Sequence, residues 1–236
     1  MHPQPSVQPV RRSSRSPSAL VLILHGGRSQ DHGRPHRFRL AYLRMLPFAR
    51  RLAADGGARG LAVWMVRYRY RGWNGPDADA RQDTEWALDE AARRHPGTPV
   101  VLVGHSMGGR AALHAAGHPC ARAVCALAPW LEGTDPVAQL AGRTVLIAHG
   151  DQDRMTDPGE SYAFAVRARR VSERVGRFEV HGDGHAMLKR ARDWHSLASR
   201  FVLGEVGIEP PDPEITNALR QPAPAGLRAA LAGAQP

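Results

Sequence analysis

Short apolar runs alternate along this chain with longer stretches in which apolar residues recur every three or four positions. The apolar runs predict buried strands, and the amphipathic stretches predict helices. The predicted strands cover residues 19–25, 61–67, 99–104, 122–128, 144–149 and 177–181. The predicted helices cover residues 38–55, 79–94, 107–117, 158–170 and 186–202. This alternation indicates an α/β fold of three layers, in which helices cover both faces of a mostly parallel, minimal six-stranded sheet.

The two ends of the chain lack this pattern. Residues 1–17 are rich in Pro, Ser and Arg, and residues 205–236 are rich in Pro and Ala. Such segments bury too little apolar surface to offset the entropy lost on ordering. We therefore predict a flexible tail over residues 1–17, one domain over residues 18–204 and an appended tail over residues 205–236. Within the second tail, residues 215–220 or 226–232 are candidates for a short helix.

The charge balance is basic, with 32 Lys and Arg residues against 22 acidic residues and a formal net charge of +10. Of the basic residues, all except Lys189 are arginines, and they are spread along the chain. This distribution indicates a general preference for arginine in the composition. A nucleic-acid interface would gather basic residues on one element or interleave them with aromatic residues. We therefore expect a small-molecule partner and no nucleic acid, while the oligomeric state stays open.

The cysteines and histidines give no sign of a metal or cofactor. Cys120 and Cys125 are too few for a disulfide framework and are interpreted as small core residues. His105 and His149 have no partner at metal-ligand spacing and are interpreted as supports of the motifs beside them. We expect neither a bound metal nor a cofactor.

No apolar run is long enough to cross a bilayer. The run at residues 19–24 follows Arg11 and Arg12, as in a signal sequence, but it is short and lacks a small-residue cleavage site. We therefore interpret it as the first core strand and expect a cytoplasmic protein without a membrane span.

The most informative motif is Gly104-His105-Ser106-Met107-Gly108, between a predicted strand and a predicted helix. A nucleophilic serine on such a sharp turn has a strained backbone and little room around it. Glycines two positions before and after the serine remove the β-carbons that would collide there. Because a serine that only caps a helix needs no such glycines, the spacing predicts Ser106 as a nucleophile.

Two further candidates follow predicted strands at their carboxyl ends. Asp153 comes shortly after strand 144–149, and His185 comes shortly after strand 177–181. Carboxyl ends of parallel strands meet at one edge of a sheet, where the loops converge. We therefore expect both side chains to lie near Ser106.

Each candidate has competitors nearby. Asp151 suits the start of a turn, and Asp157 precedes a proline as a helix cap does. His181 lies in a predicted strand and is interpreted as structural, and His195 lies in the following helix.

Four motifs, taken together and in this order, resemble those of the α/β-hydrolase family. They are His25-Gly26-Gly27, Gly104-His105-Ser106-Met107-Gly108-Gly109, His149-Gly150-Asp151-Gln152-Asp153-Arg154 and Gly182-Asp183-Gly184-His185. The resemblance implies a nucleophile at Ser106, a general base and acid at His185, and an acid at Asp153 that orients the imidazole. It also implies an oxyanion hole built from the backbone N–H groups of Gly27 and Met107, with Arg28 as an alternative to Gly27.

Residues 129–143 leave no room for the large lid that many members of this family insert there. The chain is therefore most similar to lidless members that act as esterases, thioesterases or dienelactone hydrolases, and we expect an open site. Apolar residues expected at its rim would suit an acyl chain or an aromatic ester; they are Trp73, Trp130, Leu131 and Met155. Basic loop residues near the strand ends would attract an anionic group; they are Arg28, Arg34, Arg37 and Arg154.

The function that the resemblance implies is hydrolysis of a carboxylic ester or thioester through an acyl-enzyme on Ser106. The same three residues also serve an acyltransferase, an amidase or a peptidase. A protein that keeps the fold only to bind a ligand is the hypothesis from another class, and the complete set of three residues argues against it.

Overall fold

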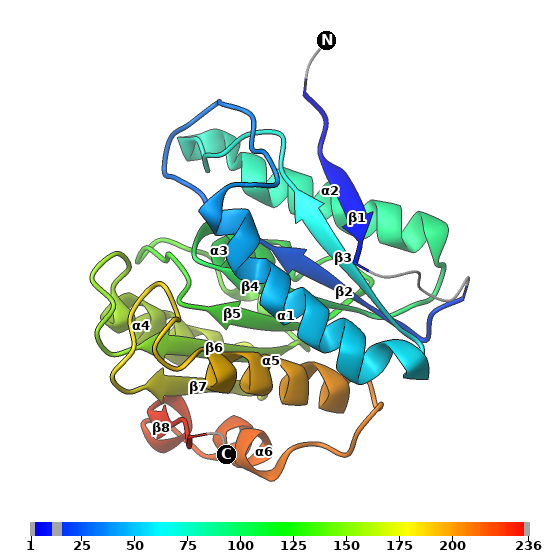
Figure 1. The fold of residues 1–236 in the computed structure, drawn as a ribbon. Helices are drawn as coiled ribbons and strands as arrows, with labels where there is room; N and C mark the ends of the chain where they lie inside the picture. Colours follow the sequence, from blue (N-terminus) through cyan, green and yellow to red (C-terminus); the bar gives the residue numbers. More distant parts are fainter. Residues whose placement is uncertain (1–2, 11–15, 234–236) are drawn as a thin grey trace.

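The computed structural model describes residues 3–10 and 16–233. Within those ranges eight strands form one sheet in the order β1-β3-β2-β4-β5-β6-β7-β8 (Figure 1). The strands are β1 (Ser6–Pro9), β2 (Ala19–Leu24), β3 (Leu61–Arg67), β4 (Val100–His105), β5 (Ala121–Leu127), β6 (Thr144–Gly150), β7 (Val175–Val180) and β8 (Ala229–Ala230). Strand β1 runs antiparallel to β3, and every other neighbouring pair is parallel.

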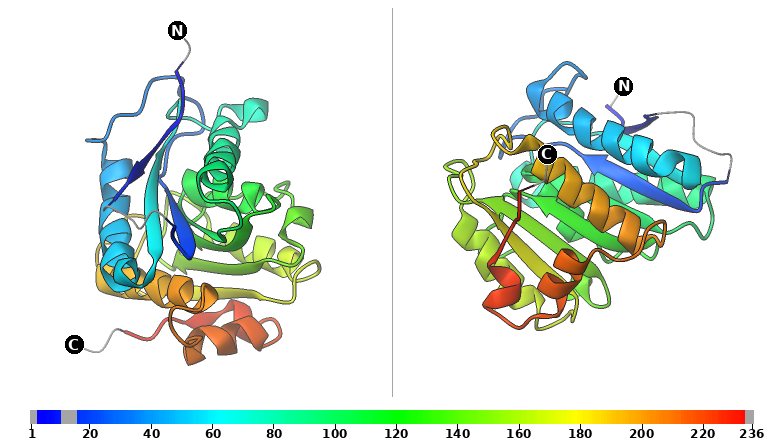
Figure 2. Two further views of the ribbon diagram at one scale, coloured as in Figure 1. Left: turned by 90° about the vertical axis from the view of Figure 1, so that its right-hand side faces the viewer. Right: turned by 60° about the horizontal axis from the view of Figure 1, so that its bottom comes forward.

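Helices cover both faces of the sheet, as the alternating pattern predicts. The helices α1 (Leu40–Gly56) and α5 (Ala191–Glu205) lie on the face turned to the viewer in Figure 1. The helices α2 (Asp79–Arg94), α3 (Met107–Ala115) and α4 (Pro158–Ala168) lie on the opposite face (Figure 2). This is the three-layer α/β architecture expected from the sequence.

The central strands are buried on both sides, which explains why they appear in the sequence as continuous apolar runs. In β2, Val21 and Ile23 pack into the core under α1 and α5, whereas Leu20, Leu22 and Leu24 pack into the core under α2 and α3. Successive side chains of a strand point to opposite faces, so both faces of β2 need apolar residues. The sheet is thereby held between two cores.

The sheet has two strands more than the six predicted. Residues 6–9, within the segment expected to be a flexible tail, form β1 and pair with β3 through Val7 and its neighbours. Residues 229–230 form β8 and pair with β7. Both additions are short edge strands, which are held by pairing to an existing strand and carry too few residues to show a periodic pattern of their own.

The C-terminal segment, expected to be an appended tail, packs against the domain. Helix α6 (Pro213–Arg220) is capped by Asp212, whose carboxylate accepts a hydrogen bond from the N–H of Ile215. Ile215 and Leu219 are buried in the same core as α1 and α5. The candidate helix at 215–220 therefore lies within α6, whereas the stretch 226–232 contains the end of a 3-10 turn and β8.

Between β5 and β6 the chain forms loops and one 3-10 turn (Ala138–Leu140), so the predicted lack of a large lid is confirmed. In the described ranges, no helix combines the length and the apolar character that crossing a bilayer requires.

Candidate active site

Ser106 occupies a sharp turn between β4 and α3. Its backbone has φ 55° and ψ −120°, a conformation that L-residues other than glycine rarely adopt. A β-carbon on Gly104 would overlap the backbone of Gly108 and lie 2.7 Å from the nitrogen of Gly109. A β-carbon on Gly108 would overlap the carbonyl of Leu24 and lie 2.7 Å from that of His25. Gly104 therefore lets the end of β4 pack against the start of α3, and Gly108 lets α3 pack against β2. Both glycines remove β-carbons that would collide, as their spacing predicts.

Asp153 and His185 meet beside this turn. Asp153 follows β6, His185 follows β7, and the Asp153 Oδ2 to His185 Nδ1 distance is 2.8 Å. His105, the residue before Ser106, donates a hydrogen bond from Nε2 to the carbonyl of His185 at 2.9 Å. The rings of His105 and His185 lie 4.7 Å apart between centroids. The structure thus brings the predicted acid and base together and ties the base to the residue next to the serine.

Asp153 is held as a carboxylate by several donors. Its Oδ1 accepts hydrogen bonds from the backbone N–H groups of Met155 and Thr156, at 2.8 and 3.0 Å. Its Oδ2 lies 3.1 Å from His149 Nε2, in addition to the contact with His185. Burial by itself raises the pKa of Asp153, but the hydrogen bonds from His149, His185 and the two backbone N–H groups outweigh it and hold that pKa well below its usual range.

Thr156 also belongs to this group, although its sequence context does not point to it. Its Oγ1 lies 2.8 Å from Asp153 Oδ2 and 3.1 Å from His185 Nδ1. The pattern of an aspartate followed three residues later by a threonine is common in turns, so it carried no specific signal. His149, interpreted as a support, does contact the acid and is anchored on its other side by Ser161, 2.9 Å from its Nδ1.

The competing acids have other roles. Asp151 contacts the exposed His181 at 3.1 Å and accepts the N–H of Gly182. Asp157 caps α4 by accepting the N–H of Gly159 at 2.7 Å. Both contacts agree with the turn and cap interpretations of these two residues.

The competing histidines also lie apart from Asp153. His181 follows the end of β7 and is exposed, so its predicted place within the strand is wrong by one residue. His195 lies in α5 and packs edge-on against Phe48 of α1, with ring centroids 4.4 Å apart.

The segment after β2 passes close to the serine. A β-carbon on Gly27 would overlap the side chain of Met107 and the carbonyl of Arg71, so this position has room for glycine alone. The N–H of Arg28 donates to that same Arg71 carbonyl at 2.9 Å. The N–H of Arg28 is thereby already hydrogen-bonded. Met107 begins α3, and the first N–H groups of a helix have no acceptor within it.

Of the four residues expected at the rim, only Met155 is largely exposed, with 79% of its surface accessible. Trp73 and Leu131 are buried, so their expected place at the rim is wrong. The guanidinium of Arg110 lies 4.5 Å from the ring centroids of both Trp73 and Trp130. These cation–π contacts hold the loops after β3 and β5 against α3, and the guanidinium covers one face of each tryptophan ring.

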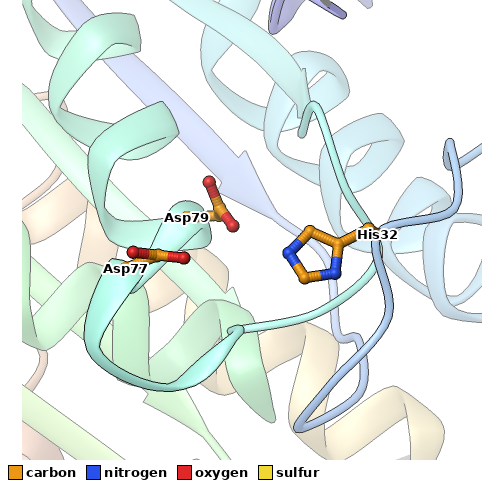
Figure 3. Close-up of side chains that lie close together, drawn as sticks. All are labelled: His32, Asp77 and Asp79. Atoms are coloured by element: carbon orange, nitrogen blue, oxygen red, sulfur yellow. The ribbon is translucent and has the colours of Figure 1, made fainter.

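One group of described side chains has the composition of a metal site, although one of its members lies far from the other two in the sequence. His32, Asp77 and Asp79 offer ligand atoms that all lie within 4.8 Å of one another (Figure 3). However, Asp79 already accepts hydrogen bonds from Asn74 at 2.8 Å and from Arg69 at 3.1 Å. These contacts account for its position without an ion, and we assign no metal to it.

Two buried histidines near the site should make the protein sensitive to acid. Burial lowers the pKa of His25 to about 4 and that of His105 to about 3, both from 6.5. Below pH 6.5 these histidines therefore bind protons in the unfolded chain but remain neutral in the folded chain. Their contribution to stability is fully present above pH 6.5 and is lost as the pH falls. Each histidine should lower the free energy of unfolding by about 2 kcal/mol between pH 7 and pH 5.

Urea unfolding at the two pH values measures this loss, and the His25→Asn variant should show a loss smaller by about 2 kcal/mol. An equal loss in the variant and the unaltered protein would contradict the assignment to His25.

A mostly parallel sheet with a strained serine on the turn after a central strand, and an Asp–His pair at the same edge, defines the α/β-hydrolase class of protein. The sequence model of a protein family, described as the Alpha/beta hydrolase family, matches residues 21–234 of this chain. The chain belongs to that family. Comparison with curated proteins gives no significant match.

Solved structures share the fold at low sequence identity. Est1E from Butyrivibrio proteoclasticus is 16% identical with a TM-score of 0.62, over 86% of this chain and 94% of that one. An α/β serine hydrolase without a lid, from Xanthomonas campestris, is 17% identical with a TM-score of 0.58, over 89% and 90%. The carboxylesterase of Bacillus cereus is 21% identical with a TM-score of 0.57, over 82% and 93%.

Proposed function

We propose that this protein is a serine hydrolase that cleaves a carboxylic ester or thioester through an acyl-enzyme on Ser106. The observation that carries the proposal is the 2.8 Å hydrogen bond between Asp153 and His185 beside the strained turn of Ser106. Membership of the α/β-hydrolase family and the fold shared with a carboxylesterase support it.

The proposed reaction has two halves. The Ser106 oxygen attacks the carbonyl carbon while His185 Nε2 takes the hydroxyl proton, and the departing alcohol or thiol then receives that proton. Water next attacks the acyl-enzyme with the same histidine as base, which releases the acid and restores the serine. Asp153 accepts from Nδ1, so it keeps the proton-accepting nitrogen free and stabilises the imidazolium.

The negative charge on the carbonyl oxygen needs donors that are already in place. We assign this role to the N–H groups of Gly27 and Met107, of which the second adds the positive end of the α3 dipole. One such donor contributes about 2.7 to 4 kcal/mol to transition-state stabilisation.

Labelling with a fluorophosphonate probe tests the proposal, because the probe reacts with an activated serine. We expect the unaltered protein to label and Ser106→Ala to give no labelled band, while Ser172→Ala, which alters a buried serine outside the site, labels normally. A folded protein that does not label, and hydrolyses no ester, would favour the ligand-binding alternative.

A further inference from the structure

A pocket of about 270 Å³ opens beside the proposed nucleophile. Its wall contains Gly26 and Gly27, the segment that follows β2. A β-carbon on Gly26 would lie only 3.3 Å from the β-carbon of Ser106. A group that extends from a substrate carbonyl bound at Ser106 therefore has this pocket as its neighbour.

Among the residues that the structure describes, three arginines and no acidic residue line the pocket. They are Arg28, Arg39 and Arg71. The carboxylate of Asp31 lies 3.3 Å from Arg71 and 3.9 Å from Arg28, and it also accepts the N–H of Gly33. One negative charge thus faces three guanidinium groups, so the pocket retains a positive excess that favours an anionic occupant.

The guanidinium group of Arg39 contains a nitrogen that is not hydrogen-bonded to any residue that the structure describes. Its Nε is buried and has no hydrogen-bond partner among the described residues. Arg39 is also the N-cap residue of α1, where no side chain caps the helix and the first turn holds no acidic residue. Leu40, Ala41 and Tyr42 of that turn line the pocket, so the positive end of the α1 dipole adds to the guanidinium charge.

His25 lies at the inner end of the pocket lining and is almost fully buried. Its Nδ1 donates to the carbonyl of Gly26 at 2.7 Å, which leaves Nε2 buried without a partner in the described ranges. A hydrocarbon chain in the pocket would offer the three guanidinium groups no counter-charge. A carboxylate would offer one, and guanidinium groups bind carboxylates through charge-assisted hydrogen bonds.

From these observations we infer that the pocket binds a carboxylate carried by the substrate, so that the enzyme prefers esters with a free carboxylate near the scissile carbonyl. This inference rests on the proposed function and names the substrate class of the same site. Arg39 acts as a specificity-determining residue, and Arg28 and Arg71 contribute charge.

Two pairs of substrates test it, because the carboxylate can belong to the acyl part or to the alcohol part. The first pair is the p-nitrophenyl half-ester of glutaric acid against p-nitrophenyl valerate. The second is 4-acetoxybenzoate against its methyl ester. We expect kcat/KM to favour the charged member of one pair by about tenfold or more, and Arg39→Gln to remove that preference mainly through KM.

Arg50→Gln is the matched control, because Arg50 is an exposed arginine of α1 and does not line the pocket. It should leave the preference unchanged, and added salt should weaken the preference in the unaltered protein. Equal kcat/KM values within both pairs, or a preference that survives Arg39→Gln, would overturn the inference. Hydrolysis of the neutral esters and fluorophosphonate labelling report separately on the proposed function.

Discussion

If the proposed function holds, replacing Asp153 by asparagine should lower kcat for a simple ester by about 10⁴, the size of loss that the same change causes in a serine protease with a Ser-His-Asp triad. The carboxylate now accepts from His185 Nδ1 at 2.8 Å and from His149 Nε2 at 3.1 Å. An amide keeps only one acceptor oxygen and turns N–H donors toward the rings. His185 then loses the tautomer whose Nε2 accepts the serine proton.

The control for this prediction is Asp151→Asn. Asp151 lies two residues away and contacts the exposed His181, so its replacement should leave kcat within about twofold. Steady-state kinetics on p-nitrophenyl acetate measures both variants, and thermal unfolding shows whether Asp153→Asn has also lost stability. Normal turnover in Asp153→Asn, together with a large loss in Asp151→Asn, would move the acid to Asp151.

The central part of the fold could be predicted from the sequence because its elements carry strong local signals. The buried strand β2 consists of aliphatic residues throughout, and β4 begins with four of them before Gly104 and His105. The turn at Ser106 was predictable for a steric reason, since both flanking glycines are required by backbone contacts with Gly108 and Leu24. Positions fixed by such local constraints show themselves in the residue types.

The edges of the sheet and the neighbours of the acid could not be predicted. Strand β8 has only two residues, and its position depends on pairing with β7 and on the burial of Leu231. Both interactions involve residues that are distant in the sequence. Thr156 contacts His185 across 29 positions of sequence, through a loop whose shape no local pattern specifies. In the sequence nothing distinguishes Arg39 from the many other arginines. Only the tertiary structure places it in the same pocket as Arg28 and Arg71.

Gly108→Ala should reduce the free energy of unfolding by about 2 to 4 kcal/mol, although alanine is the better helix former by about 1 kcal/mol. Gly108 lies in α3, where a β-carbon would overlap the carbonyl of Leu24 and press on that of His25. Both neighbours are backbone atoms of β2 and its continuation, which cannot rotate away as a side chain can. The helix must therefore move off the sheet, and Ser106 moves with it.

Gly57→Ala is the matched control for this variant. Gly57 has φ −60° and ψ −39°, and a β-carbon there meets nothing within 4 Å. The same chemical change should be neutral or should stabilise the protein by up to about 1 kcal/mol, because it reduces the entropy of the unfolded chain. Urea unfolding of the two variants separates the steric effect from helix propensity. Equal free energies of unfolding for the two variants would show that α3 can move away from β2 without cost. That result would contradict the steric reason given for glycine at position 108.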